Sequence, residues 1–239
     1  MASPPAVALH CLGFPSERLG PLSQALGLPL WRPDSDWSTS RTRVVLLLGT
    51  AWENEVAAYF APPYSTWIEV GALADQSLRE LVERAAAADF YASFTTLTAN
   101  RLDLASEILL GISARRPLAG ECRDNIELAL HEALCNAMLH GNLQMEGIGD
   151  LSVDALERFS SNLARRISDP DFANRRIDVA CDFADDSVTI DVVDQGGGFA
   201  PKPRSEPRAS GRGFELIGAS CQSFRLLEGG RRVSMRFPA

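Results

Sequence analysis

Residues 132–141 read Glu-Ala-Leu-Cys-Asn-Ala-Met-Leu-His-Gly, and they are the most informative part of the sequence. Glu132, Asn136 and His140 recur every four residues within a run of Ala, Leu and Met, so a continuous α-helix would place them on one face. We expect a helix over Glu121–His140, capped by the Gly-Asn pair that follows it. A carboxylate and an amide on an apolar helix need partners. A metal ion, phosphate oxygens or water would supply them, and a solvent-facing stripe is the alternative.

A second motif, Asp-Gln-Gly-Gly-Gly-Phe, occupies residues 194–199. Before it, Val188, Ile190 and Val192 alternate with polar residues, which predicts a strand with one buried face. Asp194 stands at the end of that strand, where its carboxylate can accept a hydrogen bond from an exocyclic amine such as that of adenine. The glycines allow a ligand to approach the backbone. A plain glycine-rich loop would have the same composition.

A third motif, Ser-Gly-Arg-Gly-Phe-Glu-Leu-Ile, occupies residues 210–217. Gly211 and Gly213 form a Gly-x-Gly turn at the start of an expected helix. Helix N-termini present free N–H groups and the positive end of a dipole to phosphate. Arg212 can add a charged donor to a terminal phosphate. A simple helix-start turn with a surface arginine is the alternative.

The pattern around these motifs predicts an α/β domain over residues 90–239. Two hairpins and the strand before them form a mixed sheet, and helices cover it in a two-layer α/β sandwich. An additional helix between the first and second motifs is not part of this two-layer arrangement. The expected elements are a strand at Phe90–Thr98, helices at Asn100–Ile112 and Ser152–Ile167, a hairpin over residues 177–192, and a second hairpin from Phe224 to Phe237.

Residues 1–88 predict a second, smaller α/β domain, because short strands alternate with short helices. The alternation loosely resembles a receiver domain. Neither Gly13 after the first strand nor Gly49 after the second is accompanied by a carboxylate, so we expect a degenerate, receiver-like interaction domain without aspartyl phosphorylation. The expected strands are Val7–Leu12, Arg43–Leu48 and Thr66–Val70, and the expected helices are Glu17–Leu26, Trp52–Phe60 and Asp75–Ala88, with Asp75 as N-cap.

Composition excludes several classes of protein. The net charge of −8 argues against a nucleic-acid binder held by phosphate contacts. No apolar run approaches the roughly 20 residues that span a bilayer, and no signal peptide is recognisable, so we expect no membrane contact. The five scattered cysteines suit reduced thiols in the cytoplasm. Every basic residue except Lys202 is arginine, which suggests a GC-rich bacterial genome.

The three motifs, in this order and spacing, resemble the GHKL ATPase family, whose fold is called the Bergerat fold. The resemblance covers residues 90–239. Within the family the chain looks most like the anti-sigma-factor serine kinases and their HATPase relatives in bacterial partner-switching systems. The short segment from Phe199 to Gly211, the His140-Gly141 pair and the lack of a preceding dimerisation helix with a phospho-acceptor histidine point to that subtype.

The resemblance implies ATP and Mg²⁺ as cofactors and assigns roles position by position. It makes Asn136 the Mg²⁺ ligand, Glu132 the general base for the attacking hydroxyl, and Asp194 the residue that reads adenine. It places the remaining cofactor-binding positions at His140, Gly196, Gly198, Phe199, Gly211, Arg212 and Gly213.

The resemblance further implies a protein serine/threonine kinase that transfers the ATP γ-phosphate to a partner regulator. The expected partner is an anti-sigma antagonist or a sigma-like regulator, and the chain itself could form a homodimer. Two alternatives stay open. One is a nucleotide-binding switch that acts only by sequestering a partner, and the other is a histidine-kinase-like phosphotransfer protein.

Overall fold

The computed structural model describes residues 6–13, 15–32, 42–49, 59, 62–71, 73–118, 120–148, 152–198 and 213–238. Contacts between Cα atoms divide the chain into two compact units. The first unit comprises the residues up to Ser93 together with Leu110–Pro117 and Ala180–Asp182, and the second comprises Phe94–Leu109, Leu118–Val179 and the residues from Phe183 onward. The predicted domain ranges, 1–88 and 90–239, stay a prediction.

The first unit contains parallel strands, as the continuous apolar run at its centre predicts. The strands β1 (Ala6–Leu12), β2 (Thr42–Leu48), β3 (Tyr64–Glu69) and β4 (Phe90–Thr95) pair in that order, and each pair is parallel. The helix α1 (Ser16–Leu26) follows β1, and α2 (Asp75–Ala87) connects β3 to β4. Both helices contribute leucines to one apolar core against the strands. The strands β1 to β3 and the helices α1 and α2 confirm the corresponding predictions.

The strand order of this unit differs from that of a receiver domain. A flavodoxin-like sheet places its first strand between the second and the third. Here β1 pairs with β2 and β2 pairs with β3, so β2 occupies the inner position. The receiver-like resemblance therefore finds no support in the topology.

Two local expectations in this unit have different outcomes. Gly27 follows α1 as its C-cap in the left-handed conformation, with φ of 63°, so the helix ends where the prediction ends it, at Leu26. The prediction that Asp75 caps α2 is wrong, because Ala74 holds the N-cap position and Asp75 is the first helical residue. Its carboxylate instead pairs with Arg18 of α1 at 2.6 Å. The helix predicted at 52–60 lies outside the described residues, apart from Tyr59.

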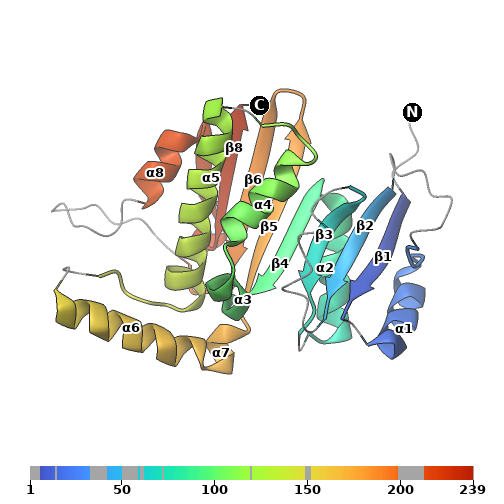
Figure 1. Cartoon of the computed structure of the whole chain (residues 1–239), viewed down its shortest axis with the longest axis horizontal. Coiled ribbons are helices and arrows are strands. Elements are labelled where there is room, and N and C mark those ends of the chain that lie inside the picture. Colours follow the sequence, from blue (N-terminus) through green and yellow to red (C-terminus); the bar gives the residue numbers. More distant parts are fainter. Residues whose placement is uncertain are drawn as a thin grey trace. The chain divides into compact units, whose positions relative to one another are not determined.

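The second unit carries antiparallel strands covered by helices. β5 (Arg176–Ala184) neighbours β6 (Ser187–Asp194), and β6 pairs antiparallel with β8 (Arg232–Pro238), which also pairs antiparallel with β7 (Ser223–Leu227). Both predicted hairpins are confirmed. The helix α5 (Gly120–Cys135), with α8 (Gly213–Ser220) beside it, covers one face of these strands (Figure 1). The predicted α/β class, with a mixed sheet and a helical layer, is confirmed.

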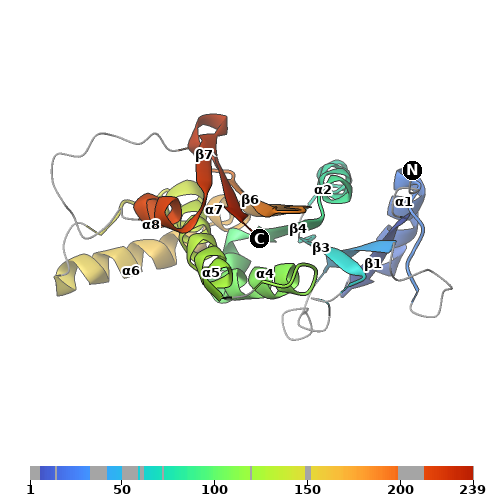
Figure 2. The same ribbon diagram turned by 90° about the horizontal axis from the view of Figure 1, so that it is seen from above.

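The other α-helices that lie wholly or mostly in this unit are α3 (Thr96–Arg101), α4 (Leu104–Ser113), α6 (Val153–Ile167) and α7 (Pro170–Ala173). α6 is the predicted extra helix, and the Ser152 hydroxyl caps it by accepting from the Ala155 N–H. None of its residues is buried, and it extends away from the strands (Figure 2). No helix in the described part of the chain is both long and apolar enough to cross a membrane.

The predictions around Thr95 and Asp103 need correction. The strand predicted to reach Thr98 ends at Thr95, whose hydroxyl accepts from the Thr98 N–H at 3.2 Å and starts α3. The single helix predicted over residues 100–112 is two helices. Asp103 separates them, because its Oδ1 accepts from the Ser106 N–H at 3.3 Å and so caps α4.

The long helix of the first motif also differs from the prediction. Regular α-helix stops at Cys135, and a π-helical segment, η2, continues from Asn136 to Asn142. Gly141 and Asn142 therefore do not cap the helix. Both residues lie inside η2 and are buried, and Leu143 is the C-cap. Such π-helical turns occur mostly as insertions in α-helices and are frequent at functional sites.

Candidate functional site

A small cavity of about 60 Å³ lies between η2, β6 and the start of α8. Four predicted site residues line it: Asn136, His140, Asp194 and Gly198. The first and second motifs, about fifty residues apart in sequence, thus meet in one place. The prediction missed Ala133, Ala137, Gly141, Val192, Phe214, Gly230 and Val233, which also line the cavity. Of these, Ala133, Ala137 and Gly141 lie within the first motif and Phe214 within the third, so their place in the motifs was the available signal.

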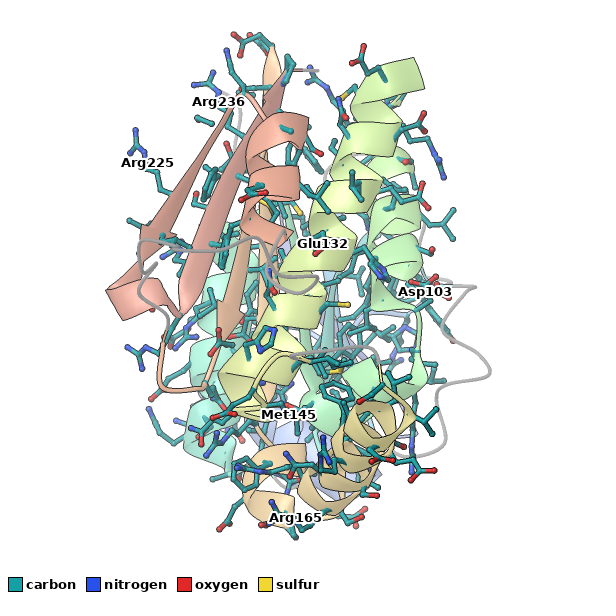
Figure 3. The ribbon with its side chains drawn as sticks, turned by 90° about the vertical axis from the view of Figure 1, so that its left-hand side faces the viewer. Asp103, Glu132, Met145, Arg165, Arg225 and Arg236 are labelled. Atoms are coloured by element: carbon teal, nitrogen blue, oxygen red, sulfur yellow. The ribbon has the colours of Figure 1, made fainter. Side chains whose placement is uncertain are left out.

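Glu132 and Asn136 meet the third motif at the start of α8. A Cβ built on Gly213 would lie 2.7 Å from Glu132 Oε2 and 3.0 Å from Asn136 Nδ2, so any larger residue there would displace the Glu132 carboxylate. Figure 3 shows Glu132 on α5, on the side where α8 begins. Asn136 Nδ2 is buried and has no hydrogen-bond partner among the described residues. A buried, unpaired amide is costly, so this group is available to a ligand.

His140 keeps its place at the cavity although the π-helical turn changes its spacing from Asn136. Its Nδ1 lies 2.8 Å from the Met145 carbonyl oxygen. A carbonyl oxygen only accepts, so the Nδ1 of this pair carries the proton.

Asp194 is held by tight backbone contacts. Its Oδ1 accepts from the Gly196 N–H at 2.7 Å. A Cβ on Gly141 would lie 2.6 and 2.7 Å from the two carboxylate oxygens, and a Cβ on Gly196 would overlap the Gly141 carbonyl. Burial raises the pKa of Asp194, while the Gly196 N–H and two nearby arginines oppose that rise. The carboxylate is thus fixed in position and partly withdrawn from water.

Gly198 is the position where the loop needs a left-handed backbone. Its φ is 82°, and a Cβ there would overlap the Gly229 carbonyl oxygen. Phe199, Gly211 and Arg212 lie outside the described residues, so their predicted roles stay predictions.

This is the arrangement expected of a GHKL-type ATPase domain. A helix with a polar stripe packs against antiparallel strands, and around one cavity lie a carboxylate held by backbone contacts and several close glycines. A family model described as histidine kinase-like ATPase domain matches residues 95–237, and the chain belongs to this family. The match confirms the GHKL resemblance. Domains of the family bind ATP, in most cases with Mg²⁺. A comparison with curated proteins finds no match.

Proposed function

We propose that the second unit binds Mg·ATP and transfers the γ-phosphate to a serine or threonine of a partner regulator. The observation that carries the proposal is the approach of the α8 N-terminus to Glu132 and Asn136, at 2.7 and 3.0 Å from a Cβ at Gly213. This places a helix N-terminus, a carboxylate and an unpaired amide around one point, beside the cavity that holds Asp194. Helix N-termini favour phosphate, and phosphoryl transfer depends on positioning and charge neutralisation.

Asn136 is the proposed holder of Mg²⁺. Magnesium in such sites takes few protein ligands and completes its shell with water and substrate phosphates. Among the described residues, no group of three or more His, Cys, Asp or Glu side chains could hold a metal ion. A site built from the Asn136 amide oxygen and nucleotide phosphates fits that finding, and it leaves the unpaired Nδ2 to donate to a phosphate oxygen.

Glu132 is the proposed general base. Its carboxylate lies one helical turn from Asn136 and next to the first residue of α8. From there Glu132 accepts the proton of the attacking hydroxyl as that oxygen bonds to phosphorus and the ADP oxygen leaves. General bases of this kind contribute about 10²- to 10⁴-fold to the rate.

Asp194 is the proposed reader of adenine, through a hydrogen bond from the exocyclic amine. The cavity beside it measures about 60 Å³, whereas sites for small-molecule ligands have roughly 300–1,000 Å³. Binding of a whole nucleotide therefore requires α8, which carries Phe214 in the cavity wall, to move outward. We expect the start of α8 to be repositioned when ATP binds.

The cellular role that we propose is that of an anti-sigma-type serine kinase in bacterial partner switching. Its partner would be an anti-sigma antagonist or a sigma-like regulator, and the chain would act in the cytoplasm as one half of a homodimer. The brevity of the segment between Phe199 and Gly211 supports this subtype. The first unit would then supply an interaction surface.

Calorimetry with Mg·ATP tests binding, and labelled-phosphate transfer to small regulatory proteins encoded beside the gene tests catalysis. Asn136→Ala should abolish binding with the fold retained. Glu132→Gln should keep binding and abolish transfer, whereas Glu127→Gln, the same change at a half-exposed position of α5, should keep both binding and transfer. Binding without transfer in the wild type would favour the nucleotide switch. Acid-labile phosphate on the chain itself would favour the histidine-kinase-like alternative.

A further inference from the structure

Asn142, at the end of η2, is a fully buried amide with every polar atom of its side chain engaged. It is 0% exposed. Its Nδ2 donates to Thr96 Oγ1 and to the Arg176 carbonyl oxygen, both at 2.9 Å, and its Oδ1 accepts from the Gln195 N–H at 2.8 Å. Since a peptide N–H only donates and a carbonyl only accepts, the orientation of this amide is fixed. Asn142 does not line the nucleotide cavity, so its role there must be indirect.

The three partners of Asn142 come from separate segments. Thr96 opens α3, Arg176 opens β5, and Gln195 follows the last residue of β6. Gln195 also reaches back, because its Oε1 accepts from the Arg176 N–H at 2.8 Å. Gln195 stands between Asp194 and Gly196, the pair joined by the carboxylate hydrogen bond at the cavity. Fixing the Gln195 backbone therefore fixes the peptide that carries the Asp194 side chain.

Arg175 extends this network away from the cavity. Its Nη1 donates to the Asn142 carbonyl oxygen at 2.7 Å, and its own carbonyl accepts from the Thr96 N–H at 2.8 Å. Its guanidinium lies 4.6 Å from the centre of the Phe172 ring in α7, and that of Arg166 from α6 lies 4.3 Å from the same ring. Cation–π contacts of this kind are attractive. The two contacts connect α6 to Arg175 through the Phe172 ring. Arg175 in turn contacts Asn142, which holds the Gln195 backbone next to Asp194.

We propose that Asn142 is a positioning residue for adenine recognition: it holds Asp194 at the cavity, and Arg175 with Phe172 ties this support to α6. The inference rests on the proposed function, because it takes Asp194 as the acceptor for the adenine amine. Removing one partner of a buried polar network leaves the others unsatisfied. The segment around Gln195 would then shift, and the carboxylate with it.

The first test is nucleotide discrimination by Asn142→Asp. The substitution keeps the shape but places an oxygen against the Arg176 carbonyl, where the donor stood. Calorimetry should compare Mg·ATP with Mg·ITP, whose purine carries an oxygen in place of the amine. We expect ATP affinity to fall roughly tenfold or more while ITP affinity changes little. Asn174→Asp, the same change at the exposed end of α7, should bind like the wild type. Equal weakening of both nucleotides, or none, would overturn the proposal.

The second test needs no nucleotide. Amide hydrogen exchange at Gln195 should accelerate at least tenfold in Asn142→Ala, which removes the acceptor oxygen, and should not change in Asn174→Ala. Arg175→Met leaves the buried amide intact, so it should fold even where the Asn142 variants do not. It should lower the ratio of ATP to ITP affinity in the same direction as Asn142→Asp by a smaller factor. Unchanged exchange at Gln195 in Asn142→Ala and in Arg175→Met would refute the positioning role. Failure of the wild type to bind ATP would refute the proposed function separately.

Discussion

A single methyl group at position 141 tests whether the Asp194 carboxylate is held where an adenine amine reaches it. Gly141 is buried in η2, and a Cβ built on it lies 2.6 and 2.7 Å from the two carboxylate oxygens. The nearest atom, Asp194 Cγ, would lie 2.4 Å from that Cβ, and ordinary van der Waals contact begins at 3.4 Å, so in Gly141→Ala the carboxylate must retreat by about 1 Å. Asp194 is tied to the Gly196 N–H, and this retreat breaks or bends that hydrogen bond.

The magnitude follows from what the carboxylate contributes. A hydrogen bond to a charged group is worth about 1.5–3 kcal/mol, so misplacing the Asp194 carboxylate should weaken ATP binding roughly 10- to 150-fold. Gly141 does not have a left-handed φ, so alanine adds no backbone strain. Overpacking at this buried site should lower the free energy of unfolding by about 1–3 kcal/mol.

Calorimetric titration with Mg·ATP measures the effect, and urea unfolding measures the stability. Gly197→Ala, next to Gly196 in the glycine-rich loop, is the matched control. A Cβ there would have no atom of the described residues within 4 Å. Its affinity for ATP should stay near that of the wild type. A folded Gly141→Ala protein that binds ATP as tightly as the wild type would refute the reasoning. Equal losses of ATP affinity in Gly141→Ala and Gly197→Ala would refute it as well, since of these two glycines Gly141 is the one that lies against Asp194.

Four further outcomes are expected. ATP affinity should weaken as the pH falls through the raised pKa of Asp194, and Asp194→Asn should flatten that calorimetric profile. The raised pKa also makes the carboxylate unfavourable to folding above that pKa, so Asp194→Asn should melt higher than the wild type at neutral pH and lose this advantage below the ordinary pKa of 3.8. Gly213→Ala, whose Cβ would lie 2.7 Å from Glu132 Oε2, should slow phosphate transfer at least tenfold, and an unchanged rate would contradict the role of that carboxylate. Gly111→Ala, whose Cβ would lie 2.7 Å from the Trp67 ring, should lower the free energy of unfolding by about 1–3 kcal/mol in urea, and no loss would mean that the ring moves freely.

The strands were predictable because their signal is local. Val188, Ile190 and Val192 alternate with polar residues, and they are buried as the alternation requires. In the pairing of β6 with β8, Ile190 lies opposite Met235 and Val192 opposite Val233, so both strands turn the same face to the core. The alternation of apolar and polar residues along a strand does not depend on which strand it pairs with, so it can be recognised from the local sequence.

The break at Asp103 was also readable, although the apolar spacing concealed it. Apolar residues at helical spacing run from Leu102 to Ile112 and favour one helix. Asp103 followed three residues later by Ser106 is a capping arrangement, and the structure uses it. A polar residue that can satisfy the first N–H groups of a helix thus outweighs continuous periodicity.

The end of the first motif was not readable from local sequence. Gly141-Asn142 after a long helix has the composition of a C-terminal cap. Its actual conformation depends on partners far away in the chain, since Asn142 bonds to Thr96, Arg176 and Gln195. The residues next to Asn142 carry no information about these partners, which lie 34 to 53 residues away in the sequence.

The same limit explains why glycines could be recognised as important without their partners. Neither Gly141 nor Gly196 has room for a side chain, because a Cβ on Gly196 would overlap the Gly141 carbonyl and a Cβ on Gly141 would press on Asp194. Two motifs that look independent in the sequence are therefore one contact, made backbone to backbone. A side chain at either glycine would separate η2 from the end of β6. The cavity is then defined as much by the side chains that these positions lack as by the carboxylate and amide that line it.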